Sequence, residues 1–382
     1  WLIVRGRLKI DRPILLGVVL AAVFAAALAW GIAHDADLST AGHEARRTVL
    51  GVGAFLLAWP LMADRAARRR LSFALVGIGL TLGLWGLAQW LFSVGYTTQA
   101  DVGVRPGVDL TSSGRGQLQG GMYAFPVAVT LAWAVLVSGG IRHRGVQCLL
   151  AAIVLLNVVC VLLTYERTFW VATGVACVGV VLMSGARARR LALRWAGAGA
   201  VVLVAIATIA PGEARTAVER LVSVAQVSTD ESFTSRLVES RAVGAAIRDQ
   251  PITGSGFGAT ITWGEEDVFG TVTTPFVHNG YLWLAWKIGI PAAAFVVLLL
   301  CLAILRRAPN DDAAEWRALR RGCQTSLLAL LLVCLTFPAF DALGITATMG
   351  LLAAISLSGR ALPQFPSVSG DFISDRERDD AS

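Results

Sequence analysis

Long apolar blocks without charge are the feature that most limits what this chain can fold into. Ten such blocks, each of about 16 to 26 residues, alternate with short Arg-rich segments. A helix needs roughly 20 apolar residues to cross the hydrocarbon core of a membrane. Only 15% of the residues are charged, against roughly 25% in soluble domains. We therefore predict an all-α, polytopic integral membrane protein with about ten transmembrane helices and one large helical outer loop.

The predicted spans and segments follow from the positions of the blocks. The spans are 14–33, 48–63, 71–94, 121–138, 146–164, 168–184, 195–210, 280–304, 325–340 and 342–357. Together they make a transmembrane domain over residues 1–358, and the polar tail 359–382 is predicted to be disordered in the cytoplasm. The chain begins at Trp1 rather than Met. We interpret this start as trimmed, so that further N-terminal spans are expected upstream.

Basic residues predict the orientation of the spans. The loops 1–13, 64–70, 139–145, 185–194 and 305–323 hold 19 Lys and Arg against 5 acidic residues, whereas the alternating loops hold 10 against 16. Short loops rich in Lys and Arg stay in the cytoplasm. The net charge of +7 is therefore an orientation signal. No aromatic-interleaved basic patch accompanies it, so nucleic acid is not an expected partner.

The longest segment between spans, residues 211–278, is predicted to lie on the outer face. A loop of this length without structure is uncommon unless it is functional. We predict a surface helix over about 216–227 and a second helix over 235–249, with Thr234 or Ser235 as its N-cap. The glycine-dense run after Pro251 follows a helix rather than a strand. It is therefore interpreted as a tight turn that lets the backbone approach another element, not as a nucleotide loop.

Three features of the outer face are candidates for chemistry, and each has a plainer interpretation. Arg167 in YERTFW could be an interfacial anchor. Arg236 and Arg241 in SRLVESR could belong to a solvated charge run that includes Glu239. His278, at the entry of a span, could be structural. A weaker signal is HDAD at 34–37, whose carboxylates could hold a divalent metal.

The order and spacing of these pieces resemble the O-antigen ligase-like family of bacterial envelope glycosyltransferases. The segments that carry the resemblance are ERTFW at 166–170, SRLVESRAVGAAIRDQPITGSGFG at 235–258 and HNGYLWLAWKIGIP at 278–291. The resemblance covers roughly Leu71 to Leu305. It implies a multi-pass protein of the bacterial inner membrane whose active site faces the periplasm. It also implies transfer of a glycan from undecaprenyl diphosphate to an acceptor hydroxyl, such as that of lipid A-core or another glycan.

The resemblance places the family's functional residues on positions of this chain. Its two arginines fall on Arg167 and Arg236, which implies binding of the diphosphate, and its histidine falls on His278, which implies a general base. Planar guanidinium groups bind phosphate oxygens in pairs and stabilise a departing diphosphate, so no metal or other cofactor is expected. An imidazole with an ordinary pKa near about 6.5 suits proton removal at neutral pH.

Secondary candidates and alternatives remain open at this level. Arg241, Asn279 and Lys287 are secondary candidates for the site, and Lys287 stands where the family more often has an uncharged or acidic residue. A polysaccharide polymerase of the same family fits as well as a ligase. A flippase or permease for lipid-linked glycans is the alternative without chemistry. That alternative predicts charged groups near the membrane midplane, whereas Lys287 is the one ionisable residue in the ten predicted spans.

Overall fold

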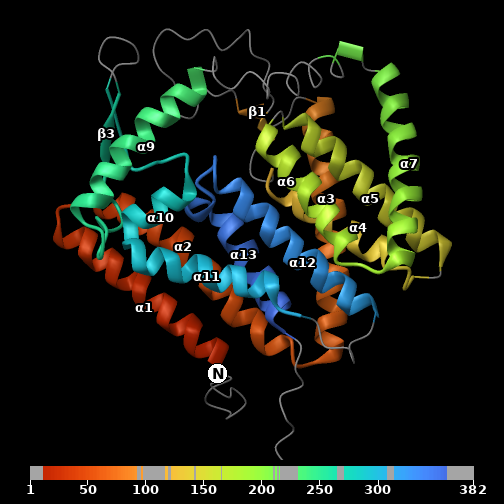
Figure 1. Ribbon diagram of the computed structural model, residues 1–382, viewed down its shortest axis with the longest axis horizontal. Coiled ribbons are helices and arrows are strands. Elements are labelled where there is room, and N and C mark those ends of the chain that lie inside the picture. Colours follow the sequence, from red (N-terminus) through yellow and green to blue (C-terminus); the bar gives the residue numbers. More distant parts are fainter. Residues whose placement is uncertain are drawn as a thin grey trace, which may run out of the picture.

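The computed structural model describes residues 12–92, 96–97, 117–118, 122–141, 143–164, 166–209, 211–212, 215, 231–264, 271–307 and 314–358. This part of the chain is mostly helical, as predicted (Figure 1). The helices are α1 (Arg12–Ala33), α2 (Leu38–Leu61), α3 (Arg65–Phe92), α4 (Ala124–Val137), α5 (Arg144–Leu163), α6 (Arg167–Leu182), α7 (Ala186–Ile209), α9 (Glu231–Asp249), α10 (Gly280–Ile288), α11 (Ile290–Leu305), α12 (Ala314–Val333) and α13 (Leu343–Leu357), with the 3-10 turn η4 (Ala339–Asp341).

Several helices have the length and composition that a membrane span requires. Among the described residues, α1, α3, α5 and α7 are long and apolar enough to cross a membrane. Helices α4, α6, α11 and α13 are apolar but shorter. Each coincides with a predicted span or with part of one. Four long spans are therefore supported, and the count of about ten stays a prediction.

Helices α2, α7 and α12 begin well before the spans predicted for them, and α7 begins at Ala186 rather than 195. Helix α2 begins at Leu38 rather than 48, where the Asp37 side chain accepts a hydrogen bond from the backbone N–H of Thr40. Helix α12 begins at Ala314 rather than 325. Hydropathy marks only the apolar part of a helix, whereas Ala, Glu and Arg continue it at little cost. The extensions bring Glu44 and Arg320 into helices, and both side chains are buried.

The predicted span 280–304 is broken into two helices. Helix α10 ends at Ile288 and α11 begins at Ile290, with Gly289 between them at φ +80°. Pro291 cannot donate a backbone hydrogen bond and therefore favours a new helix start rather than continuation of the first. A Cβ at position 289 would collide with the backbone carbonyl of Ile252. The break thus creates the space in which the outer segment touches the helical bundle.

Short strands depart from the all-α prediction. The pair β1 (Tyr96–Thr97) and β2 (Gln117–Leu118) and the pair β3 (Ile261–Trp263) and β4 (Val272–Thr274) are both antiparallel. Strands β3 and β4 are built from Ile, Thr, Val and Trp, which favour strands. The β3–β4 hairpin stands beside α9 at one end of the molecule (Figure 1).

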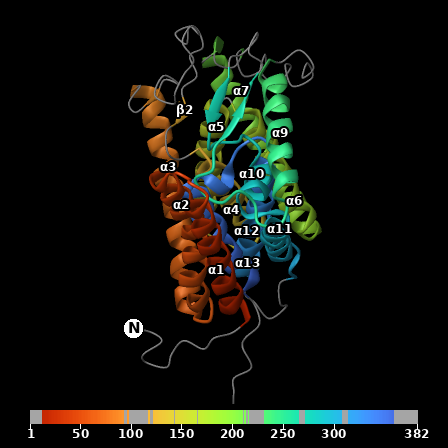
Figure 2. The same ribbon diagram turned by 90° about the vertical axis from the view of Figure 1, so that its left-hand side faces the viewer.

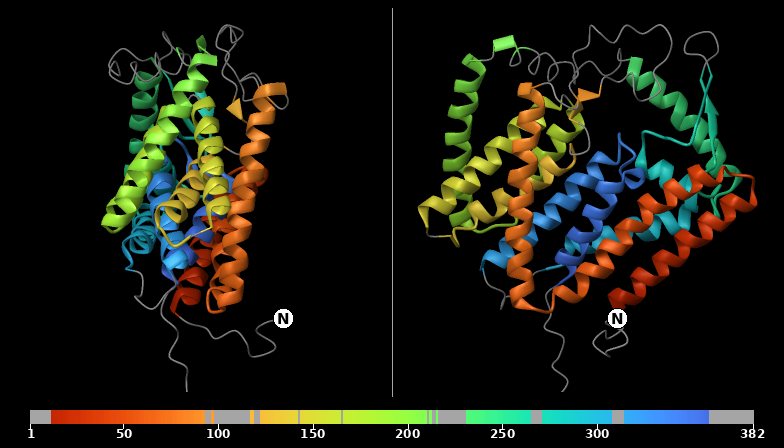
Figure 3. Two further views of the ribbon diagram at one scale, coloured as in Figure 1. Left: turned by 90° about the vertical axis from the view of Figure 1, so that its right-hand side faces the viewer. Right: turned by 180° about the vertical axis from the view of Figure 1, so that it is seen from behind.

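The helices pack around α12, most of whose side chains are buried. Helices α4 and α6 contact one side of α12, and α13 contacts its other side. Helix α2 in turn packs against α13. Helix α1 covers α2, while α3 and α5 cover α4 (Figures 2 and 3). The closest of these contacts joins α2 to α13, where a Cβ at Gly350 would collide with the carbonyl of Gly51. Small residues at such crossings are typical of helices packed within membranes.

The outer segment 211–278 is described in part. Its second helix, α9, ends at Asp249 as predicted but begins at Glu231, so Thr234 and Ser235 lie inside the helix and neither is its N-cap. The surface helix predicted over 216–227 and the tail 359–382 lie outside the described residues. In Figure 1, α9 and the β3–β4 hairpin rise above the end of the bundle opposite to the first residues of α1.

Candidate active site

His278 stands immediately before α10, in a position set by the cap of that helix. The side chain of Asn279 accepts hydrogen bonds from the backbone N–H groups of Tyr281 and Leu282, at 3.0 and 3.1 Å. An Asn at this position satisfies donors that the first turn leaves without partners. The backbone N–H of Gly280 donates to the carbonyl of Cys334 at 2.7 Å, which ties α10 to the end of α12. Asn279, a secondary candidate for the site, therefore positions His278 from the next residue.

Glu239 of α9 holds His278 through two contacts. One carboxylate oxygen lies 2.7 Å from Nδ1 of the ring, and the other accepts the backbone N–H of His278, also at 2.7 Å. The Glu239 side chain is 2% exposed, whereas that of His278 is 38% exposed. A carboxylate beside Nδ1 keeps the proton on that nitrogen. Nε2 of a neutral ring is then the atom that can accept a proton.

The surroundings of the His278 ring also favour its use as a proton acceptor. Phe276 packs its ring edge-on to that of His278, with centroids 4.9 Å apart. Within the described residues, no protein group forms a hydrogen bond with Nε2. The imidazole is thus fixed on one side by Glu239 and Phe276 and accessible on the other. This is the arrangement of a base whose second nitrogen is oriented by a carboxylate.

The two arginines of α9 differ in exposure. Arg236 is half-buried and lies one turn before Glu239, so that the two side chains share a face of the helix. Arg241 is exposed. The structure therefore brings Arg236 to the side of α9 that faces His278. The interpretation of 235–241 as a solvated charge run is wrong for Glu239, which is almost fully buried.

Arg167 reaches the same region from another element. It is the first residue of α6 and is half-buried with contacts of its own. The neighbouring Thr168 is hydrogen-bonded to Thr336 at 2.6 Å, in the turn that follows α12. Gly280 is bonded to the beginning of that same turn, at Cys334. The start of α6 and the start of α10 are therefore both bonded to the segment that follows α12.

A glycine turn, residues 251–258, follows the last residue of α9 and connects it to the end of α10. Helix α10 ends at Ile288, which leaves its last carbonyl groups without helical partners. The turn supplies donors for two of them: the N–H groups of Ser255 and Gly256 donate to Trp286 and Lys287 at 2.7 and 3.0 Å. Gly256 has φ +82° and lies against the backbone of α1, where a side chain would not fit. The prediction of a turn for close backbone approach is confirmed.

Lys287 forms a buried ion pair with Glu44, called here the buried pair. Its Nζ lies 3.0 Å from the Glu44 carboxylate and donates to the carbonyl of Ala259 at 2.6 Å. The second Glu44 oxygen accepts the N–H of Gly258 at 2.6 Å. Lys287 is fully buried, so in this structure it reaches no substrate-accessible surface. Through these contacts, the buried pair connects α10 to α2 and to the end of the glycine turn.

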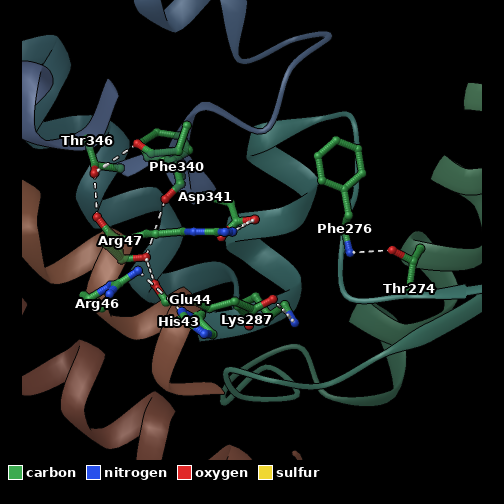
Figure 4. Close-up of polar contacts among 12 residues, drawn as sticks. His43, Glu44, Arg46, Arg47, Thr274, Phe276, Lys287, Phe340, Asp341 and Thr346 are labelled. Carbon is green, nitrogen blue, oxygen red and sulfur yellow. Dashed lines mark hydrogen bonds and ion pairs between the residues drawn. The ribbon is translucent and has the colours of Figure 1, made fainter. Parts of the chain in front are cut away.

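A second ion pair lies next to the first. Arg47, one turn after Glu44 on α2, contacts the Asp341 carboxylate at 3.1 Å (Figure 4). The hydroxyl of Thr346 also donates to the carbonyl of Arg47. Figure 4 shows both pairs rooted on the same stretch of α2, with Lys287 approaching from one side and Asp341 from the other. Helix α2 is thereby tied to α10 and to the chain entering α13.

Asp35 and Asp37, in the predicted outer loop 34–47, line a polar pocket of about 490 Å³. Asp37 there is engaged as the cap of α2, and hydrogen bonds from the Thr40 backbone and hydroxyl hold its pKa below its ordinary value. Asp35 is exposed, at φ +62°. In the part of the chain that the structure describes, no group of three or more His, Cys, Asp and Glu side chains could hold a metal ion. Metal independence stays a prediction.

The apolar helices and the acid–base site at one end of them define the class: a helical membrane protein with a candidate enzymatic centre at the membrane surface. Residues 150–297 match the model of the family described as O-antigen ligase, which confirms the resemblance to an O-antigen ligase-like family. The match includes Arg167, Arg236, Glu239 and His278, and it indicates a membrane glycosyltransferase of the ligase or polymerase type. None of the curated proteins compared with the chain matches it.

Two buried carboxylates that hold the region of the site together, Glu239 and Glu44, are not identified by the sequence analysis. From the sequence, Glu239 fits a solvated charge run, because adjacent charges on a polar helix give no sign of which one is buried. Glu44 was assigned to a loop. A signal for Lys287 was present, because a lone lysine in an apolar span requires a buried partner. The sequence did not indicate which of the many carboxylates that partner was.

Proposed function

We propose that this protein transfers a glycan from undecaprenyl diphosphate to an acceptor hydroxyl at the outer face of the bacterial inner membrane. The observation that carries the proposal is the contact of buried Glu239 with Nδ1 of half-exposed His278. A carboxylate that orients an imidazole by one nitrogen prepares the other nitrogen to take a proton. A pure binding protein has no evident need for such a pair.

The proposed reaction is a direct displacement. His278 removes the proton of the acceptor hydroxyl through Nε2 as the acceptor oxygen attacks the anomeric carbon. The bond from that carbon to the diphosphate oxygen breaks, and the diphosphate leaves with the electron pair. Attack from the face opposite the leaving group inverts the anomeric centre. Glu239 stabilises the imidazolium that forms, because its carboxylate stays ionised beside Nδ1.

Arg167 and Arg236 are proposed to bind the diphosphate. A guanidinium group is always charged and offers its N–H groups in a planar fork that matches phosphate oxygens. Charge on the leaving group grows during the displacement, and donors placed beforehand stabilise it most at that moment. Two arginines from separate elements, α6 and α9, could hold the two phosphates without a divalent metal. Added chelator is therefore expected to leave transfer intact.

The identity of the acceptor distinguishes two forms of the proposal, a ligase and a polymerase. A ligase transfers a finished glycan to an acceptor such as lipid A-core, and a polymerase extends a growing lipid-linked glycan. The family match supports both types. We favour the ligase, and the flippase or permease remains the alternative if no transfer occurs.

The decisive experiment is a transfer assay with the purified protein. Undecaprenyl-diphosphate glycan is incubated with lipid A-core in one sample and with a second lipid-linked glycan in another. Formation of glycosylated lipid A-core identifies a ligase, and elongation of the lipid-linked glycan identifies a polymerase. The released undecaprenyl diphosphate is measured as a second product. Donor binding without either product would contradict the enzymatic proposal.

The orientation is tested separately in cells. A cysteine introduced at Ser228 should react with an impermeant thiol reagent, in spheroplasts if an outer membrane intervenes. A cysteine at Ala188, near the start of α7, should stay protected, and so should one at Ala186, which is exposed in the structure and therefore reports orientation rather than burial. These reactivities follow from the distribution of basic residues between the two sets of loops. The reverse pattern would place the His278 site in the cytoplasm and overturn the proposed substrate.

A further inference from the structure

A large apolar groove lies between four helices, away from the candidate active site. It has a volume of about 790 Å³ and is lined by α1, α2, α11 and α13. This size falls within the range of about 300–1,000 Å³ that ligand sites occupy. Nearly all of its lining is aliphatic or aromatic, as at Leu16, Phe55 and Met349. The exceptions with a formal charge are Arg12 and Arg306.

Both charged residues lie at one end of the groove. Arg12 is the first residue of α1, and Arg306 follows the last residue of α11. Trp59, near the end of α2, lines the same end. Exposed Arg side chains next to a Trp are typical of the boundary between hydrocarbon and head groups. The other lining residues lead from this boundary into the apolar interior.

This charged end is the end away from His278. Near its last residues, α1 meets the glycine turn, because Gly31 touches Phe257. Helix α11 follows α10, which begins beside His278, so Arg306 lies two helices further along the chain. In Figure 1 the first residues of α1 lie opposite to α9 and the β3–β4 hairpin. The basic-residue pattern assigns this end to the cytoplasmic side.

The length of the groove along its helices is comparable to the thickness of one leaflet. On α1 the lining runs from Arg12 to Phe24, and twelve residues of helix rise about 18 Å. On α11 it runs from Val296 to Arg306, a rise of about 15 Å. Half of the hydrocarbon core is about 15 Å thick. A lipid chain entering beside the arginines would therefore fill the groove to about the membrane midplane.

We infer that this groove binds an anionic glycerophospholipid of the cytoplasmic leaflet. Its acyl chain lies against the aliphatic lining, and its phosphate contacts Arg12 and Arg306. A cationic pair on an apolar groove matches a lipid that combines a negative head group with an acyl chain. The inference shares the membrane orientation with the proposed function but is independent of glycan transfer.

The position of the arginines argues against the donor's own lipid chain as occupant. In the proposed function the diphosphate of the donor lies with Arg167 and Arg236, at the other end of the helices. A prenyl chain could enter the groove only with its apolar terminus near Arg12 and Arg306. Guanidinium groups gain nothing from such a terminus, whereas a phosphate satisfies their charge and their donors.

The test measures lipid binding by native mass spectrometry of the purified full chain. Palmitoyl-oleoyl phosphatidylglycerol, an anionic lipid, is compared with the zwitterionic phosphatidylcholine of the same chains. The variants are Arg12→Gln/Arg306→Gln for the head group and Leu16→Trp for the chain. Arg307→Gln and Leu15→Trp are their matched controls, because both residues are exposed neighbours outside the lining.

The expected result is one tightly bound phosphatidylglycerol. Its dissociation constant should rise at least about tenfold in Arg12→Gln/Arg306→Gln, since a basic residue near the membrane surface contributes on the order of 1 kcal/mol. Leu16→Trp should lose the lipid, and both controls should bind it normally. Because the two arginines are exposed, their variant keeps the test decisive even if Leu16→Trp does not fold.

Four outcomes would overturn the inference. Equal binding of the two phospholipids would remove the role of the arginines, and so would an equal effect of the controls. Displacement of phosphatidylglycerol by undecaprenyl phosphate would assign the groove to the donor chain. A dimer without bound lipid would assign it to a second copy. Glycan transfer by Arg12→Gln/Arg306→Gln is assayed in parallel, so a failure here is distinct from a failure of the proposed function.

Discussion

Helix α10 has a carboxylate paired with a basic side chain at each end, and the two pairs differ in exposure. Before its first residue, Glu239 holds a His278 side chain that is 38% exposed. In its last turn, Glu44 holds a Lys287 side chain that is 0% exposed. Both carboxylates come from other helices, and both also accept a backbone N–H. The chemistry of the two contacts is therefore similar.

What distinguishes the two pairs is whether the basic member can reach a substrate. The accessible ring of His278 can exchange a proton with a bound molecule, and Glu239 decides which nitrogen does so. The ammonium group of Lys287 forms an ion pair with Glu44 and donates a hydrogen bond to the carbonyl of Ala259. A buried pair of this kind ties elements together, and removal of one partner leaves a charge without compensation. Exposure therefore distinguishes the pair proposed to act in catalysis from the buried pair that connects helices.

The largest expected effect is that of His278→Ala on turnover. Loss of a general base costs about 10²–10⁴-fold, and donor binding should persist because it is assigned to the arginines. The protein should fold and insert normally. Transfer per folded molecule is compared between the variant and the parent; near-normal turnover would make His278 structural.

A smaller loss is expected for Glu239→Gln, which preserves the shape of the pair. The amide can donate to Nδ1, which would place the ring proton on Nε2 and leave no acceptor there. We expect turnover to fall about 10²-fold, towards the lower end of what general acid–base catalysis contributes, because the base remains in place. Histidine NMR shifts would report the changed tautomer. An unchanged tautomer together with full activity would show that Glu239 only packs against the ring.

The arginines should follow with losses of about tenfold or more. Lysine keeps the charge of Arg167 or Arg236 but lacks the planar fork, so Arg167→Lys and Arg236→Lys should each bind the diphosphate more weakly. Arg241→Lys is the matched control on the exposed face of α9. Binding of undecaprenyl diphosphate and the transfer rate are measured for all three. If the three variants behave alike, the arginines only anchor the protein at the interface.

The smallest effect on turnover is expected at the buried pair, where stability should change instead. Lys287→Met leaves the buried Glu44 carboxylate without its cation, which typically costs about 3–5 kcal/mol. The yield of folded protein and its thermal midpoint should fall, while transfer per folded molecule stays normal. The double variant Lys287→Met/Glu44→Leu should recover much of the loss, because apolar replacement of a buried pair is often neutral. Lost turnover with normal stability would give Lys287 a role in the reaction.

The local pattern of the chain determined the positions of the apolar helices and the outline of the site. Charge-free blocks mark segments that are stable in hydrocarbon, and each block contains or overlaps a helix of the structure. The glycine turn was also predictable, because several glycines after a proline strongly favour a turn. His278, Arg167 and Arg236 were found through their order and spacing, which survive as local motifs in the sequence.

The tertiary structure decided which charges are buried and what they contact. Glu239 lies 39 residues from His278, and Glu44 comes from a helix at the other end of the chain. The break at Gly289 likewise depends on the glycine turn that packs into it. Local sequence sets the propensity of a segment and its hydropathy. A buried charge is tolerated only where a distant partner arrives, and packing alone determines which partner that is.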